Sequence, residues 1–165
     1  MTTTKIPPFP KAGLQFLKGL KRNNRREWFL EHKADYEDNV RGPMEAIVEA
    51  IAPELKKIAP ELEASRKASL FRIYRDTRFS KDKSPYKTHV AASFPPAGLV
   101  RHQGAGLYLH IAPGEFFIGG GLYSPESQDL LAVRDHIAER HRQFESIVAA
   151  PRFSKMFVEV SGAQL

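Results

Sequence analysis

The chain has 165 residues, of which 42% are hydrophobic and 27% charged, and its formal net charge is +6. This length suits one domain with a real core, and the composition is that of an ordinary globular protein rather than a disordered or fibrous one. The lack of cysteine excludes disulfides, thiol nucleophiles and cysteine-based metal centres, and the lack of a long apolar run predicts a non-exported, cytoplasmic protein without a membrane span.

Positive charge is concentrated in two segments of the chain. Residues 1–43 carry nine basic and five acidic residues, and residues 71–89 carry six and two. If the two segments lie on one face of the protein, they form a basic surface suited to phosphate or another polyanion. If they lie on opposite faces, the charge indicates little beyond solubility.

Three helices are predicted before residue 60. Residues 1–10 are rich in proline and threonine and predict an irregular lead-in. Apolar residues at helical spacing then predict helices over about 11–22, 28–40 and 43–58. Trp28, which lies on the second of these apolar stripes, is more typical of a core residue than of a platform for base stacking.

Particular residues mark the boundaries of these helices. Asn23 or Asn24 is expected to cap the second helix by accepting a hydrogen bond from a free amide of its first turn. Pro43 fits the first turn of the third helix. Pro53 lies inside that helix and predicts a kink or a restart, because an internal proline costs about 3 kcal/mol.

Strands are predicted in the middle of the chain. Residues 70–74 and 90–94 have the pattern of strands on either side of the basic segment. Alternating apolar residues over 107–111, a turn at Pro113 and Gly114, and a second apolar run over 116–118 predict a β-hairpin.

A final helix is predicted with Ser124 as its cap and Pro125 in its first turn. Its expected buried stripe consists of Leu130, Val133, Ile137, Phe144 and Val148. Residues 153–160 fit either a helix or a strand. Helices first, strands next and a helix last predict one α+β domain over residues 1–165, with helices packed on a mostly antiparallel sheet of four or more strands.

Residues 71–89 are the strongest candidate for a functional site. Aromatic side chains separate the cations of this segment, so it must be partly packed, which brings several cations close together. Arginine can donate to two oxygens of a phosphate or carboxylate at once, and lysine acts as a point charge. We therefore predict a site for a phosphate-bearing or other anionic small molecule, provided that the cations meet around one accessible hollow. The predicted ligand-binding residues are Arg72, Arg75, Arg78, Lys81, Lys83, Tyr86 and Lys87. The candidates for a catalytic acid or base are Asp76, His89 and His110.

Two other interpretations stay open. The same cations, together with Lys21, Arg22, Arg25 and Arg26, would form a non-catalytic surface for nucleic acid, whose binding weakens steeply with salt. Alternatively, Arg75 with Asp76, and Lys81 and Lys83 with Asp82, form surface ion pairs that only fix the shape of the loop, in a structural or partner-binding module. No metal site is predicted, because no His-Glu-x-x-His or His-x-His motif occurs, and no cofactor is assigned.

Three stretches of the chain resemble a known family. They are the basic motif from Arg75 to Thr88, the upstream run from Asn23 to Phe29, and the segment from Tyr108 to Pro125. This pattern is similar to that of a widespread bacterial and fungal family of uncharacterised proteins, known only as a conserved domain of unknown function. The resemblance implies no activity. It implies that members usually continue past Leu165, so a shortened form is expected.

Overall fold

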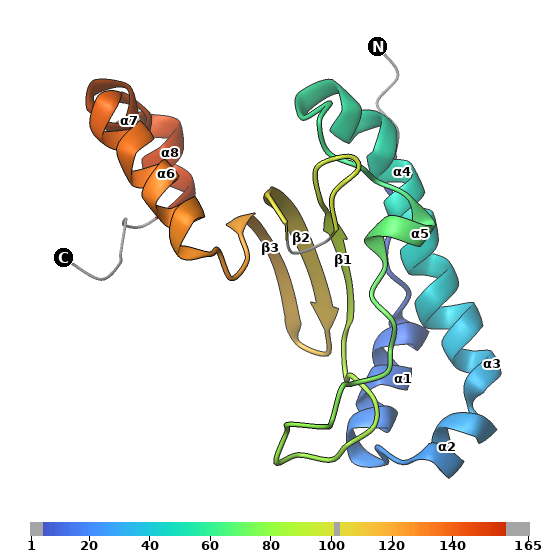
Figure 1. Ribbon diagram of the computed structural model, residues 1–165. Coiled ribbons are helices and arrows are strands. Elements are labelled where there is room, and N and C mark those ends of the chain that lie inside the picture. Colours follow the sequence, from blue (N-terminus) through green and yellow to red (C-terminus); the bar gives the residue numbers. More distant parts are fainter. Residues whose placement is uncertain (1–4, 101–102, 158–165) are drawn as a thin grey trace. The chain divides into compact units, whose positions relative to one another are not determined.

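The computed structural model describes residues 5–100 and 103–157. Its contacts divide the chain into two units, with the boundary between Tyr123 and Ser124 (Figure 1). The first unit contains a helical layer and a sheet, and the described residues of the second, 124–157, contain helices and no strand. The predicted α+β class is therefore confirmed. No helix in the described ranges combines the length and the apolar character needed to cross a bilayer.

The helices of the first unit form where apolar spacing predicts them. Their bounds are α1 (Lys11–Arg22), α2 (Arg26–Glu31), α3 (Lys33–Tyr36), the π-helical turn η1 (Glu37–Arg41), α4 (Gly42–Ile58) and α5 (Arg66–Ser69). The predicted second helix is divided at His32, whose Nδ1 lies 2.9 Å from the carbonyl oxygen of Trp28. Of the two alternatives at Pro53, the restart is wrong, because α4 continues through this residue to Ile58, and the kink stays a prediction.

The predicted asparagine cap of the second helix is also wrong. Arg25 occupies the capping position of α2 and makes no side-chain capping bond. Asn23 Nδ2 instead donates to the carbonyl oxygen of Gly19 at the end of α1. Asn24 is turned toward a distant segment, where its side chain bonds the backbone of Tyr86. A long-range partner has therefore replaced the local one.

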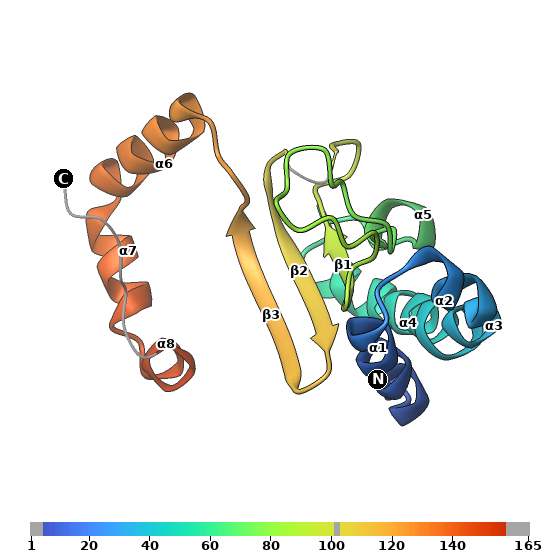
Figure 2. The ribbon, with the colours of Figure 1, turned by 90° about the horizontal axis from the view of Figure 1, so that it is seen from below.

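Three antiparallel strands form the sheet, in the order β1 (Val90–Phe94), β2 (Ala105–Ala112), β3 (Glu115–Leu122). The strand over 90–94 and the hairpin are confirmed, with Ala112 paired to Glu115 across the turn and Gly114 at a φ of 83°. Figures 1 and 2 show α1 to α5 beside β1, with β3 the strand farthest from them. Within the described residues the sheet has three strands, whereas four or more were expected.

The predicted strand over 70–74 is the one that does not form. Leu70 makes a single bridge to Ala92 of β1, and Tyr74 makes a single bridge to Tyr86. The segment leaves the edge of β1 after this one pairing and continues to the base of the loop over 75–83. No continuous ladder of backbone hydrogen bonds therefore develops. The carbonyl oxygen of Arg72, between the two bridges, accepts a hydrogen bond from the Lys87 ammonium.

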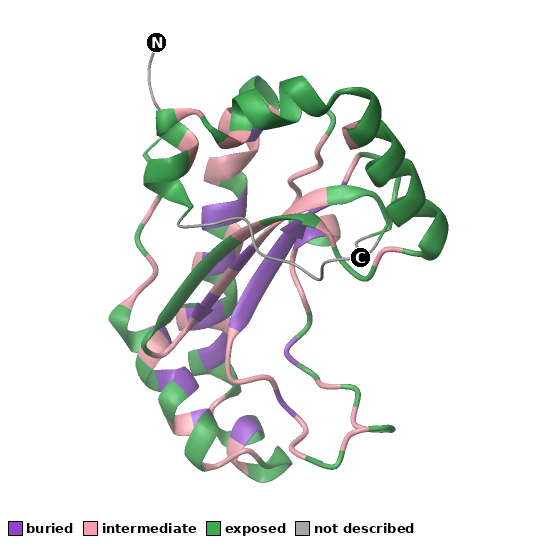
Figure 3. Ribbon diagram, turned by 90° about the vertical axis from the view of Figure 1, so that its left-hand side faces the viewer, coloured by how far each residue is buried: buried purple, intermediate pink, exposed green. Residues whose placement is uncertain are grey.

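The core of the first unit lies between its helices and one face of the sheet. Leu17, Leu20 and Val40 are fully buried, and they belong to the same apolar cluster as Ala92 and Leu109 of the sheet. All five residues of β1 are buried, which makes it the most deeply enclosed strand (Figure 3). Because side chains alternate along a strand, residues that flank these core positions point to the opposite face of the sheet.

The second unit consists of α6 (Ser127–Glu139), α7 (His141–Val148) and α8 (Pro151–Met156). The cap predicted at Ser124 is wrong: Glu126 caps α6, its backbone amide donating to the carboxylate of Asp129 at 3.0 Å. The predicted buried stripe is wrong as well, since α6, α7 and α8 contain no buried residue among those described. For residues 153–160 the helix alternative is confirmed up to Met156, and residues 158–160 lie outside the described ranges.

Candidate functional site

The sheet face opposite the core has a floor of small residues. In the strand registers Ser93 pairs with Tyr108, which pairs with Gly119, and Gly106 pairs with Gly121. Paired residues share a face, so these five positions lie together on one side of the sheet. Serine or glycine at four of the five leaves space that larger side chains would have filled.

A hollow of about 660 Å³ occupies this floor. We call it the sheet-face pocket, and all of its lining residues belong to the first unit. Its side walls include Phe71, Lys87, His89, Tyr108, Phe117 and Tyr123. A volume of this size is typical of small-molecule sites, which bury most of a ligand among apolar side chains and fix it with a few polar ones.

Glycine is required at two positions of this floor. A methyl group at Gly106 would lie 2.7 Å from the carbonyl oxygen of Phe94, and one at Gly119 would lie 2.8 Å from the ring of Phe117. The first contact involves backbone, which cannot move aside. The glycines therefore allow β1 to approach β2 closely, and they let the Phe117 ring lie over the floor.

Ser93 supplies a polar group at the base of the pocket. Its residue is only 7% exposed, and its Oγ has no hydrogen-bond partner among the described residues. A buried hydroxyl without a partner costs about 1–3 kcal/mol. Since the pocket is lined by Ser93, a ligand oxygen or nitrogen could provide the missing partner.

Two histidines stand beside one another in the same region. The rings of His89 and His110 are stacked with centroids 4.3 Å apart, and the Tyr108 hydroxyl lies 3.1 Å from His110 Nδ1. Burial, together with the positive charges that His110 and Lys87 can carry, lowers the pKa of His89 from 6.5 to about 4. His89 is therefore neutral at neutral pH. Burial also raises the pKa of Tyr108.

Lys87 brings a permanent positive charge to the pocket. Its ammonium donates to the carbonyl oxygen of Arg72 at 2.9 Å and lies 5.2 Å from the centre of the Phe71 ring. These contacts hold the lysine stem against an apolar wall, and the charged end stays close to His89, whose pKa it lowers. The pocket thus combines aromatic walls with one cation and a neutral imidazole.

The arginines of the basic motif are placed differently. Arg78 donates two hydrogen bonds to Asp76, at 3.0 and 2.7 Å, and Arg75 is ion-paired with Asp82. The Arg78 guanidinium lowers the pKa of Asp76 to about 2, and hydrogen bonds from Ser84 and Arg75 lower that of Asp82. Ion pairs therefore form within the loop, but their partners differ from the predicted pairs, Arg75–Asp76 and Lys81–Asp82–Lys83.

The predicted ligand-binding residues lie in several different surroundings. Only Lys87 of that set lines the sheet-face pocket, beside the catalytic candidate His89. Arg72 lines a second hollow of about 460 Å³ on the helix side of the same unit. Tyr86 is buried and stacked on Phe29, with ring centroids 4.2 Å apart. Lys83 donates to the carbonyl oxygen of Thr77 on the exposed loop. A ligand-binding role for the residues outside the pocket stays a prediction.

Sequence reasoning missed Ser93 and Phe117. Their signal was the alternation of small residues in the predicted strands. Ala91 and Ser93 of β1 fall on one face of the sheet, and Gly119 and Gly121 of β3 fall on the same face. In residues 5–100 and 103–157, no group of three His, Asp or Glu side chains is arranged to hold a metal ion.

Comparison with known proteins identifies a family and nothing closer. Residues 12–165 match the model of a family described as "Conserved hypothetical protein (DUF2461)". No curated protein and no solved structure matches the chain.

Proposed function

We propose that this chain, which belongs to the DUF2461 family of conserved hypothetical proteins, binds in its sheet-face pocket a small molecule that carries a phosphate or carboxylate and a flat apolar part. The observation that carries the proposal is the buried Ser93 hydroxyl, which has no partner among the described residues and lies in a hollow that is also lined by a lysine. Buried polar groups are nearly always hydrogen-bonded, and those that are not frequently face a ligand or an ordered water.

The charge of the pocket favours an anion. Lys87 is cationic, and burial, with the charges that His110 and Lys87 can carry adding a repulsion, lowers the pKa of His89, so this environment disfavours a second positive charge. An anion bound beside both groups would offset this repulsion and favour the protonated form of His89. A cationic ligand would instead be repelled by Lys87.

The walls of the pocket favour an apolar, planar group next to the anion. Three aromatic side chains, those of Phe71, Tyr108 and Phe117, line the hollow. Aromatic rings gain about 0.5–1.5 kcal/mol from stacking beyond the burial of their area. The glycines of the floor let such a group approach the backbone of β3.

His89 fits binding better than catalysis in the ligand-free protein. General bases work best when their pKa lies near the working pH, and a pKa of about 4 makes this imidazole a weak base at neutral pH. A bound anion would raise that pKa toward the useful range. A reaction in this pocket would therefore depend on the charge of the substrate itself.

Calorimetric titration with phenyl phosphate, and separately with inorganic phosphate, tests the proposal. We expect phenyl phosphate to bind more tightly, and Ser93→Ala to weaken it roughly 10- to 150-fold, the effect of one hydrogen bond to a charged group. Lys87→Met should weaken it as well. Lys83→Met is the matched control, because each of these two ammonium groups donates to a loop carbonyl at 2.9 Å but only Lys87 lines the pocket.

Two results would contradict the proposal. One is equal loss of phenyl phosphate binding in Lys83→Met and Lys87→Met, which would place the ligand elsewhere on the basic loop. The other is the absence of binding by a wild-type protein whose cooperative unfolding shows that it is folded.

A further inference from the structure

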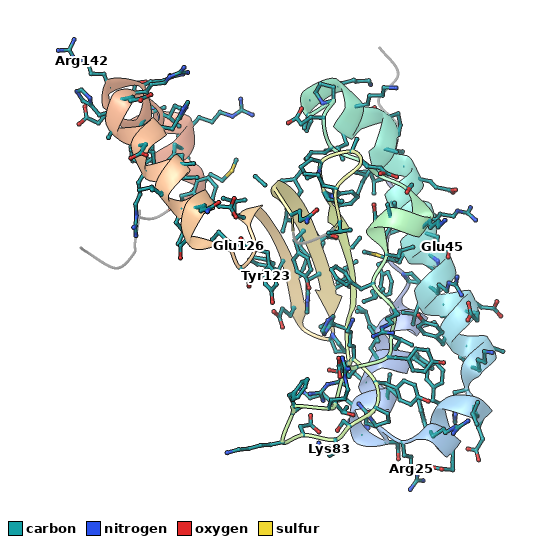
Figure 4. The ribbon with its side chains drawn as sticks, in the orientation of Figure 1. Arg25, Glu45, Lys83, Tyr123, Glu126 and Arg142 are labelled. Carbon is teal, nitrogen blue, oxygen red and sulfur yellow. The ribbon has the colours of Figure 1, made fainter. Side chains whose placement is uncertain are left out.

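The two basic segments of the chain meet at one end of the first unit. Asn24, in the turn between α1 and α2, bonds the backbone of Tyr86 at the base of the loop. Burial raises the pKa of Tyr86, and Arg26 lies near enough for its charge to oppose that rise. Figure 4 shows Arg25 and Lys83 at the same end. We call residues 21–27 and 75–83 together the basic end.

The basic end has a large excess of positive charge. It contains eight basic residues and three acidic ones. Asp76 and Asp82 are engaged by Arg78 and Arg75. Among the described residues, six cations of the basic end have no carboxylate within 4 Å: Lys21, Arg22, Arg25, Arg26, Lys81 and Lys83. Lys21 and Arg22 also stabilise the C-terminal end of α1 through the helix dipole. That effect does not explain the cations of the loop over 75–83.

Phe79 stands exposed among these cations. Its side chain is 94% exposed, and the Arg78 guanidinium lies 5.7 Å from the centre of its ring. The loop that carries it is tied on both sides, by the two hydrogen bonds from Arg78 to Asp76 and by the bond from Lys83 to the carbonyl oxygen of Thr77. The ring is therefore presented to solvent by a loop whose shape is held by its own contacts.

We propose that the basic end binds single-stranded nucleic acid. An unpaired base stacks on the ring of Phe79, and the surrounding cations bind the phosphates of the strand. Proteins that bind single strands combine a positive track for the backbone with aromatic rings for the bases. A duplex offers no free base face, and neither an α-helix nor a pair of strands projects from the loop to enter a groove.

An anionic membrane is the main competing partner for an exposed aromatic ring among cations. Membrane attachment of this kind depends on the apolar area that enters the interface. Phe79 is the only apolar residue of the loop over 75–83, and its neighbours are charged or hydroxylated. One ring matches the stacking of one base better than it matches insertion into lipid.

Fluorescence anisotropy with a labelled 20-nucleotide oligo(dT), across a range of KCl concentrations, tests this proposal. We expect binding that is tighter than to a 20-base-pair duplex, with log K falling against log [KCl] by about 0.7 for each phosphate neutralised. Phe79→Ala should weaken binding roughly 5- to 150-fold, and Phe79→Trp should restore it. Arg25→Gln and Lys83→Gln should each reduce the salt slope, whereas Lys56→Gln, at an exposed position of α4, should not.

Three outcomes would overturn the proposal. The first is no binding of oligo(dT) at 50 mM KCl, and the second is equal affinity of wild type and Phe79→Ala. The third is binding to phosphatidylserine vesicles but not to oligo(dT), which would identify a membrane surface instead. Because Phe79 is exposed, its replacement by alanine is expected to leave the unfolding temperature unchanged, and measuring that temperature separates lost binding from lost folding.

Discussion

Asn24 and Tyr86 are joined by two hydrogen bonds across 62 positions of sequence. The Asn24 side-chain amide donates to the carbonyl oxygen of Tyr86 at 2.9 Å, and the Tyr86 amide donates to Asn24 Oδ1 at 3.0 Å. Together with the stacking of Tyr86 on Phe29, this pair attaches the base of the loop to α2. It therefore holds in place the loop that carries both Phe79 and the cations around it.

Asn24→Ala should destabilise the first unit by about 2–3 kcal/mol, because it leaves two backbone groups of the buried Tyr86 without partners. Urea unfolding measures the change. Asn23→Ala is the matched control, since its side chain makes one bond within its own helix end and a smaller loss is expected. Equal losses in the two variants would show that the long-range pair adds nothing.

Ser93→Ala should leave the free energy of unfolding unchanged or raise it by about 1 kcal/mol, because it removes a buried hydroxyl that has no partner. Ser69→Ala should do the opposite. Ser69 is also buried, but its Oγ accepts a hydrogen bond from the Ser65 amide at 3.2 Å. Thermal unfolding of both variants measures the contrast, and a destabilised Ser93→Ala would mean that the hydroxyl is bonded in the ligand-free protein.

The stability of the first unit should fall as pH is lowered from about 6.5 to about 4. In this window the unfolded chain binds a proton at His89 that the folded protein excludes, since the folded pKa is the lower one. The free energy of unfolding therefore decreases with falling pH, by at most about 1.4 kcal/mol per pH unit.

His89→Gln should reduce this dependence, and His141→Gln, at an exposed position of α7, should not. Urea unfolding at several pH values gives the slopes. Identical slopes for wild type and His89→Gln would show that His89 titrates normally in the folded protein.

Asp82→Asn should speed the cleavage of the basic loop by trypsin. The Asp82 carboxylate accepts the Ser84 amide at 2.9 Å and pairs with Arg75, so its loss releases both sides of the loop. Cleavage after Arg78, followed by mass spectrometry, is the appropriate measure because the substitution does not alter the residues next to that bond. Asp38→Asn removes an exposed carboxylate of η1 and should leave the rate unchanged.

Periodicity and turn residues in the sequence were sufficient for much of the fold. The apolar spacing of Leu17 and Leu20 predicted α1, and the alternation around Leu109 with a proline–glycine turn predicted the β2–β3 hairpin. These elements are set by contacts between neighbours in sequence and by one buried face, so their signal is local. The basic motif was likewise visible as a local excess of charge.

Only the tertiary structure decided which of the predicted site residues come together. Asn24 has the chemistry of a helix cap, yet the backbone of Tyr86 is its partner, and residues 70–74 have the pattern of a strand, yet they pair with β1 at one position. Lys87 and His89 face the pocket while Arg75 and Arg78 pair with carboxylates of their own loop. The physical reason is that the strand register, and the path of the chain between elements, decide which side chains lie together. Both depend on partners that are far away in the sequence.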